Sequence, residues 1–124
     1  MHMFRSFVLL CAAVPVFSQV PADPDRVLFD LGTRAEAAGR LERAKLTLVT
    51  LASTYTGSPL ADKARAELGA IYMFLEAQDK VRSGETQAAY ETFRTLMRVY
   101  PESPLAKRAD ETSKSLGIPA DPRR

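Results

Sequence analysis

The side chains that could carry acid–base or nucleophilic chemistry are spread along this 124-residue chain and form no catalytic motif. We interpret the carboxylates as lying on solvated helix faces beside basic neighbours, whereas general acid–base catalysis favours a carboxyl group in an apolar pocket. A Ser nucleophile would lack its commonest base, because His2 is the only His. The carboxylates in question are Glu36, Glu42, Asp62, Glu67, Glu85 and Glu91. We therefore expect that the protein is not an enzyme.

The first residues have the pattern of a secretory signal peptide. One basic residue, Arg5, is followed by an apolar run from Phe7 to Phe17 and then by the small residue Ser18. The run is about half of the roughly 20 residues that a membrane-spanning helix needs, which argues against an uncleaved anchor. We predict a signal peptide at residues 1–18, cleaved before Gln19, and a mature protein that is periplasmic or secreted.

Cys11 leaves a second possibility open, because a cysteine in an apolar leader can be the lipid-attachment site of a bacterial lipoprotein. The preceding residues, Val8 to Leu10, argue against lipidation, since such signals usually have a small residue directly before the cysteine. Lipidation would anchor the protein at the outer membrane. Without it, we expect membrane association only through a partner.

Cleavage of the leader would remove both His2 and Cys11, which limits the sites that the mature chain can build. Zinc, haem and iron–sulfur sites would lose their usual ligands, and disulfides would be excluded. The charges are interspersed and nearly balanced, with 17 Lys and Arg against 15 Asp and Glu in the whole chain. This balance gives no large basic patch for nucleic acid. We therefore predict no metal site, no cofactor and no nucleic-acid partner.

From Asp23 onward, apolar residues recur at three- and four-residue spacing, which is the pattern of amphipathic helices. No stretch alternates as a half-buried strand would, so we predict an all-α fold. The expected helices run from Pro24 to Gly39, Arg40 to Tyr55, Pro59 to Arg82, beyond Gly84 to Val99, and Pro104 to Ser115. We expect residues 19–115 to form the helical domain and residues 116–124 a disordered tail.

The inward faces of these helices follow from the same spacing. In the first helix we expect Val27, Leu28, Leu31, Ala35 and Ala38 to face inward. In the second helix we expect Leu41, Ala44, Leu48, Leu51 and Ala52, and in the third Ala61, Ala64, Leu68, Ile71, Tyr72 and Leu75. In the fourth we expect Ala88, Ala89, Phe93, Leu96 and Met97.

An internal repeat organises the helical region. The segment 55–61, Tyr-Thr-Gly-Ser-Pro-Leu-Ala, recurs at 100–106 as Tyr-Pro-Glu-Ser-Pro-Leu-Ala, and the same shift aligns Gly39 with Gly84 and Ala44 with Ala89. A fixed period in so short a chain indicates stacked supersecondary units. Short loops between the helices favour antiparallel helical hairpins.

The spacing inside each unit resembles the tetratricopeptide repeat (TPR). Five, nine, twelve and seventeen residues after Gly84 stand Ala89, Phe93, Leu96 and Pro101, as in the second helix of that repeat. After Gly39 the same offsets hold Ala44, Leu48 and Leu51, with Thr56 in the place of Pro, and Leu31-Gly32 and Leu68-Gly69 match the first helix. The segment 100–109, of the form Tyr-Pro-x-Ser-Pro-x-Ala-x-x-Ala, is similar to the BamD-like outer-membrane lipoproteins and the Tol-Pal-associated periplasmic TPR proteins. The resemblance covers about residues 26–112.

The resemblance implies antiparallel helical hairpins stacked as a short right-handed solenoid, closed by a capping C-terminal helix. Three departures stand out, and the first is that the lipid-attachment cysteine expected of the BamD-like lipoproteins is poorly placed at Cys11. The BamD-like proteins are about twice as long, and the period here is 45 residues where the TPR has 34. The excess is about three helical turns, so we expect a lengthened third helix to absorb it.

The resemblance also implies a groove lined by the first helix of each repeat, where a protein or peptide partner binds. Carried over by position, this groove holds Arg26, Phe29, Thr33 and Glu36 from the first repeat, and Lys63, Ala66, Ala70, Met73 and Phe74 from the second. Phe74 lies off the predicted inward stripe and could be an exposed aromatic anchor. The alternative is that Phe74 packs against a neighbouring helix.

Taken together, these expectations describe an exported protein–protein interaction scaffold of the bacterial cell envelope. Outer-membrane assembly and envelope maintenance are the processes that the resemblance suggests. The alternative is a structural module that self-associates, in which an exposed end helix pairs with a second copy and no peptide groove is used.

Overall fold

Helices joined by short turns make up residues 23–119, the part of the chain that the computed structural model describes. Their order is α1 (Pro24–Ala37), α2 (Leu41–Thr54), α3 (Pro59–Arg82), α4 (Thr86–Val99) and α5 (Pro104–Ser115). Within this range there is no strand, which confirms the all-α prediction. The predicted signal peptide at 1–18 lies outside the described residues, and so does most of the predicted tail.

The repeated Ser-Pro-Leu-Ala segment is a helix start used twice. Ser58 and Ser103 are the N-caps of α3 and α5, and a Pro occupies the next position in both helices. Each serine hydroxyl accepts a hydrogen bond from the backbone N–H two residues on, at 3.0 Å in the first case and 3.1 Å in the second. A serine side chain in this position satisfies one of the N–H groups that a helix start leaves unpaired.

The two hairpin turns are built alike, around Gly39 and Gly84. Both glycines have positive φ, 80° and 82°, which a residue with a Cβ rarely adopts. The N–H of Gly39 donates to Glu36 O and that of Arg40 to Ala35 O, and the same two bonds recur at the turn around Gly84. This is the Schellman pattern of a helix end. The two hairpins therefore have the same local design.

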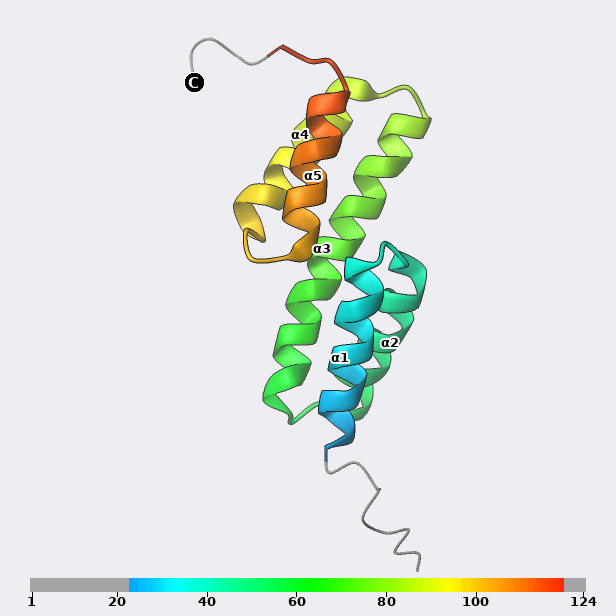
Figure 1. Cartoon of the computed structure of the whole chain (residues 1–124), viewed down its shortest axis with the longest axis vertical. Coiled ribbons are helices and arrows are strands. Elements are labelled where there is room, and N and C mark those ends of the chain that lie inside the picture. The colour runs from blue at the N-terminus through cyan, green and yellow to red at the C-terminus, as the bar shows by residue number, and fades with distance from the viewer. Residues whose placement is uncertain (1–22, 120–124) are drawn as a thin grey trace, which may run out of the picture.

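The long helix α3 is the axis of the molecule (Figure 1). It has 24 residues, against 14 in each of α1, α2 and α4, so the predicted lengthening of the third helix is confirmed. The α1–α2 hairpin lies along the first half of α3, and α4 and α5 lie along its second half. The last turn of α1 reaches the first turn of α5 near the middle of the molecule, where α1, α3 and α5 are in mutual contact.

The core runs along both sides of α3 and matches the predicted faces of α2 and α4. Ala44, Leu48 and Leu51 of α2 are fully buried, as are Phe93 and Leu96 of α4. Gly32 allows α1 to approach α2 closely, because a Cβ at that position would lie 2.6 Å from Leu48 Cδ2. The predicted core of these two helices is thus confirmed.

The predicted inward face of α1 is partly wrong. Val27 and Leu31 are 42% and 52% exposed, and Ala38 is exposed as well. The side that faces inward carries Gly32, Ala35 and Glu36. The close contact at Gly32 sets this orientation, since only the side without a Cβ can lie against α2. The apolar stripe through Val27 and Leu31 is left on the outside.

The face predicted for α3 was too narrow. Its stripe through Ala64, Leu68 and Ile71 is buried, but Tyr72 is 50% exposed. A second buried stripe runs through Ala70, Phe74 and Ala77. A helix with hairpins on two sides buries a wider arc than one amphipathic stripe predicts.

Candidate functional site

The structure divides the nine predicted groove residues into accessible and buried ones. Arg26, Lys63 and Ala66 are exposed, and Phe29, Thr33 and Met73 are half-buried. Glu36, Ala70 and Phe74 are buried, which removes them from any surface that a partner could contact without rearrangement. A role in partner binding for the six accessible residues stays a prediction.

The expected exposure of Phe74 is wrong. Its side chain is 1% exposed, and its ring packs edge-on against Phe93 with the ring centroids 5.3 Å apart. The guanidinium of Arg108 lies 5.3 Å from the Phe74 ring centroid. Phe74 therefore joins α3, α4 and α5 as a core residue, and the alternative of packing against a neighbouring helix is confirmed.

Glu36 is the most unusual polar residue of the described chain. We expected a solvated carboxylate, but its side chain is fully buried where α1, α3 and α5 meet. The hydroxyl oxygen of Ser103 lies 3.1 Å from Glu36 Oε1 and 3.1 Å from Glu67 Oε2. Glu36 Oε2 has no hydrogen-bond partner among residues 23–119. Two carboxyl groups and one hydroxyl thus form a compact cluster in which Glu36 and Ser103 are buried and Glu67 is partly exposed.

Burial, the largest cause, and the neighbouring Glu67 carboxyl together raise the pKa of Glu36 to about 8, against the Ser103 hydroxyl, which acts in the opposite direction. Glu36 is therefore predominantly protonated at neutral pH. A proton on Glu36 also supplies the donor that a hydrogen bond between the two carboxyl groups requires. The cluster has the raised pKa of a general acid, but no cleft opens onto it, since Glu36 has no exposed surface.

The sequence contains a signal for this cluster in its repeated serines. Ser58 is the counterpart of Ser103 in the repeat, and its hydroxyl donates to Asp25 Oδ2 at 2.6 Å. Both repeated serines therefore form a hydrogen bond to a carboxyl group of an earlier helix. Asp25 lies 33 positions before Ser58, and Glu67 lies 36 positions before Ser103. A serine N-cap with an acidic residue about 33 to 36 positions upstream marks the pairing.

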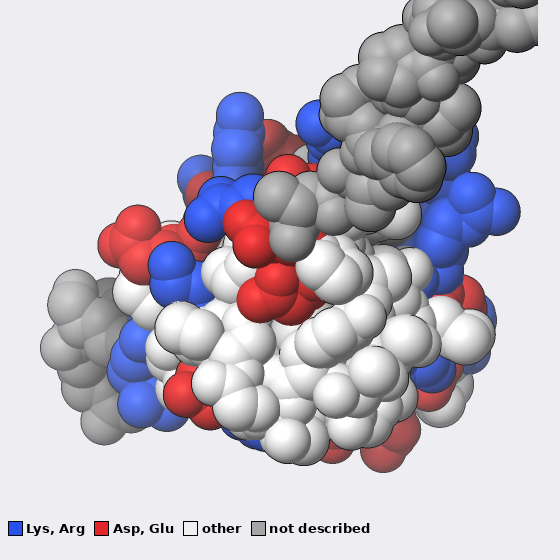
Figure 2. Space-filling model, turned by 90° about the horizontal axis from the view of Figure 1, so that it is seen from below, with Lys and Arg blue, Asp and Glu red and all other residues white. Residues whose placement is uncertain are grey.

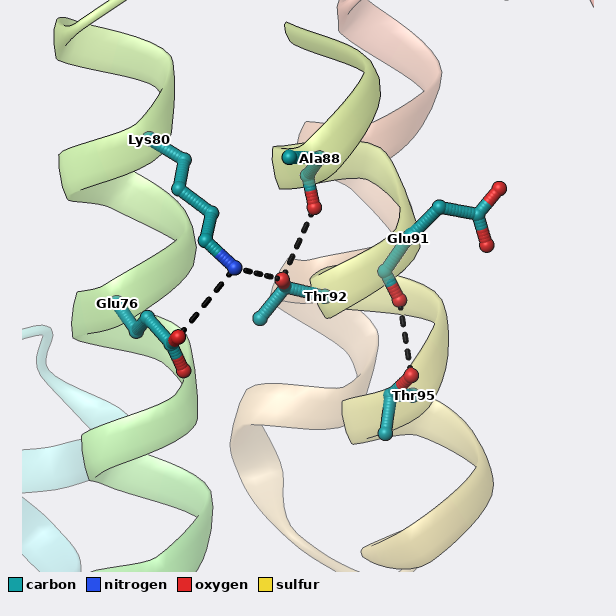
Figure 3. A network of polar contacts seen from close by, with 6 residues as sticks. All are labelled: Glu76, Lys80, Ala88, Glu91, Thr92 and Thr95. Atoms are coloured by element: carbon teal, nitrogen blue, oxygen red, sulfur yellow. Dashed lines mark hydrogen bonds and ion pairs between the residues drawn. The ribbon is translucent and has the colours of Figure 1, made fainter. Parts of the chain in front are cut away.

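A shallow groove of about 340 Å³ lies between α3 and α4 and includes the predicted residue Met73. Figure 3 shows its polar wall. Lys80 Nζ donates to Thr92 Oγ1 at 2.9 Å and pairs with Glu76 Oε1 at 3.3 Å. The Thr92 hydroxyl donates in turn to the Ala88 carbonyl at 2.9 Å. Lys80, Glu76 and Thr92 thus satisfy one another, whereas the exposed Glu91 carboxylate accepts, within the described residues, only from Gln87, at 3.2 Å.

A second surface pocket, of about 310 Å³, is lined by arginines from α1, from the turn after it and from α2. Arg34, Arg40 and Arg43 surround a floor that includes Leu31 and Ala35. None of the three arginines belongs to an ion pair within the described range, and the nearby Glu42 pairs with Lys45 at 2.7 Å. The pocket can accept an anionic group.

One end of the molecule has almost no charge. The chain from Leu46 to Ala61 contains no Asp, Glu, Lys or Arg, and it forms the second half of α2, the following turn and the start of α3. Figure 2 views this end directly and shows a broad uncharged surface with charged residues around it. Within this stretch, Leu46 and Val49 of α2 are 62% and 41% exposed. We call this surface, residues 46–61, the uncharged end.

The described residues contain no group of three or more His, Cys, Asp or Glu that could hold a metal ion. No helix between residues 23 and 119 is long and apolar enough to cross a membrane.

Comparison of the chain with protein-family models, with curated proteins and with solved structures finds no match in any of the three.

Proposed function

We propose that this protein is an exported TPR-like interaction scaffold of the bacterial cell envelope, and that it binds a protein partner through the uncharged end. The observation that carries the proposal is the exposure of Leu46 and Val49 on a surface without charge. Exposed apolar side chains are common singly, but their grouping on an uncharged surface is typical of interaction sites. Terminal repeats of a solenoid usually have a polar outer face instead.

Several features support TPR-like stacking as the finer description of the fold. The two hairpins share the same glycine turn and the same Ser-Pro helix start. Helix α3 packs against α2 on one side and α4 on the other, as the first helix of a second repeat would. In this description α5 is the capping helix.

The accessible residues of the predicted groove extend the same surface. The hydrogen bond from Ser58 to Asp25 holds the first turn of α3 beside the first turn of α1. Arg26 and Lys63, both exposed, therefore flank the uncharged end from those two turns. An apolar centre with a charged rim is the usual composition of a protein–protein interface. The same two turns also carry Asp25 and Asp62, so the rim has both signs of charge. The partner segment that fits is one with apolar side chains at its centre and polar or charged groups at its edge.

The proposal is tested by placing a photo-crosslinking amino acid at Leu46 in living cells and identifying what it captures. We expect an envelope protein to be captured from position 46. The matched control is Val99, an equally apolar and 47% exposed position on α4, from which that protein should not be captured. Capture of cytoplasmic proteins alone, or of the same proteins from both positions, would refute the proposal.

A self-associating module is the second candidate, and the same exposed apolar pair favours it. In this case the uncharged end of one copy would pack against that of another. Light scattering of the purified chain separates the two functions. A dimer that becomes monomeric in the double variant Leu46→Glu/Val49→Glu supports self-association, whereas a monomer in both forms supports a different partner.

A further inference from the structure

The contact between the last turn of α1 and the start of α5 depends on a few polar groups. Ser103, the N-cap of α5, reaches Glu36 in the last turn of α1. Arg108, one turn further along α5, lies against Gly39, where its Nη1 atom would be 3.0 Å from an added Cβ. Few other groups join the two ends, because α1 and α5 each pack mainly against other helices. Any change at Glu36 therefore acts directly on this junction.

A count of hydrogens around Ser103 shows that the junction holds an extra proton. The Ser103 hydroxyl has one hydrogen and faces two carboxyl oxygens, each at 3.1 Å. It can donate to one of them and can accept from the other only if that carboxyl group is protonated. Its second lone pair already accepts from the N–H of Leu105. One proton on Glu36 Oε1 or on Glu67 Oε2 supplies a hydrogen for both contacts with Ser103, whereas an ionised pair leaves one of the two contacts without a hydrogen.

The orphan atom of the cluster points to the same conclusion independently. Glu36 Oε2 is buried and has no donor nearby in the described structure. A buried carboxylate oxygen without a donor is costly, and the cost is smaller when the carboxyl group is neutral. The unpartnered oxygen therefore favours a neutral Glu36 over an ionised one.

We propose that Glu36, Glu67 and Ser103 form a proton-dependent latch, which holds α1 against α5 while one proton is shared and releases the junction when that proton is lost. The latch would make the coupling between the two hairpins depend on pH. The inference does not depend on which partner the uncharged end binds.

The charged groups around Glu36 come from two of the neighbouring helices. Glu67 of α3 is the nearest charge, and its effect on Glu36 is repulsive once both are ionised. On α5, Ser103 contributes only its hydroxyl, and the Arg108 guanidinium lies beside Gly39 and the Phe74 ring. Neither α2 nor α4 contributes to the shift at Glu36, and no ion pair in the range 23–119 includes Glu36 or Glu67. Loss of the proton would thus leave a buried negative charge outside any ion pair, although the buried Arg108 Nη1 at the same junction has no hydrogen-bond partner in the described range.

Two measurements on the full chain test the latch. The first is an NMR titration of the Glu36 side-chain carboxyl carbon, for which we expect a midpoint near pH 8 and not near 4.5. The second is the distance between spin labels on Ala37 and Lys107, two exposed positions on α1 and α5, introduced as Cys residues in a Cys11→Ser background. We expect a narrow distance distribution at about pH 6 that broadens at about pH 9, on either side of the midpoint.

The variant Glu36→Gln should keep the narrow distribution at both pH values, because its amide is neutral and can still donate a hydrogen bond. The matched control is Glu111→Gln, which changes an exposed carboxylate on α5. Its distance distribution should broaden at about pH 9, as that of the wild type does. Three results would overturn the proposal. They are a titration midpoint of Glu36 near pH 4.5, a wild-type distance distribution that does not change with pH, and a distance distribution that broadens in Glu36→Gln. Restoration of the narrow distribution at about pH 9 by Ca²⁺ would also overturn it, since a metal ion would then be the natural occupant. If Glu36→Gln fails to fold, the two wild-type measurements still decide.

Discussion

Ser58 donates a hydrogen bond of 2.6 Å to Asp25, and so ties the first turn of α3 to the first turn of α1. Ser103 stands in the corresponding relation to Glu67, where the contact is part of a buried cluster. The repeated serine therefore has two roles, since it caps its own helix and also reaches a carboxylate of an earlier one. The internal repeat therefore determines contacts between helices as well as the positions at which helices start.

Ser58→Ala should destabilise the fold by about 1–2 kcal/mol, because it removes both the cap and the bond to Asp25. Urea unfolding followed by circular dichroism measures the change. Ser53→Ala is the matched control, since Ser53 is exposed and bonds only to carbonyls of its own helix. A loss no larger than that of Ser53→Ala would show that the contact with Asp25 contributes nothing to stability.

Phe74→Ala should lower the free energy of unfolding by about 3–5 kcal/mol, the usual range for removing a buried aromatic ring. The ring is enclosed by Phe93 and Arg108, and its removal would leave a cavity between α3, α4 and α5. Tyr72→Ala is the control on the same helix and should cost much less, because Tyr72 is 50% exposed. Thermal unfolding compares the two. A Phe74→Ala protein with unchanged stability would restore the idea of an exposed anchor.

The contrast between Phe74 and the helix boundaries shows what the sequence could predict. The helix starts and ends were predictable because Ser-Pro pairs and glycines act locally, on the few residues beside them. The core of α2 and α4 was predictable because each has one dominant apolar stripe. Phe74 was not, because its burial depends on α5 covering a second side of α3, and periodicity along one helix carries no information about that neighbour.

Glu36 shows the same limit for the candidate site. A Glu among alanines near a helix end resembles any solvated helix residue, and its burial depends on residues 31 and 67 positions away. The orientation of α1 was missed for a related reason. Val27 and Leu31 form a proper apolar stripe, but the close approach at Gly32 decides which side meets α2. Contacts between distant segments thus determine the site, whereas local patterns determine the elements.

Gly32→Ala should destabilise the protein by about 1–3 kcal/mol, because the new methyl group would overlap the Leu48 side chain. Gly57→Ala is the matched control. Gly57 lies in a turn with nothing within 4 Å of an added Cβ and without positive φ, so the change should be neutral or slightly stabilising. Differential scanning calorimetry of the two variants measures both effects. Equal melting temperatures would contradict the close packing of α1 on α2.

The two buried or bonded carboxylates should make stability depend on pH in opposite directions. The hydrogen bond from Ser58 lowers the pKa of Asp25 below 3.8, so its contribution is present above that value and is lost as pH falls through the lower, folded-state pKa. The pKa of Glu36 is raised to about 8, so its contribution is full below its ordinary value of 4.5 and is lost as pH rises toward 8.

We therefore expect the free energy of unfolding to be greatest in mildly acidic solution, between about pH 4 and pH 5, and to decline steadily toward about pH 8. Urea midpoints measured across this range test the profile. Glu36→Gln should flatten the alkaline side and leave the acidic side unchanged, whereas Ser58→Ala should weaken only the dependence on the acidic side. Each variant removes the cause of one pKa shift and leaves the other in place. If Glu36→Gln changed the acidic side of the profile, or Ser58→Ala the alkaline side, groups other than Glu36 and Asp25 would determine how stability depends on pH.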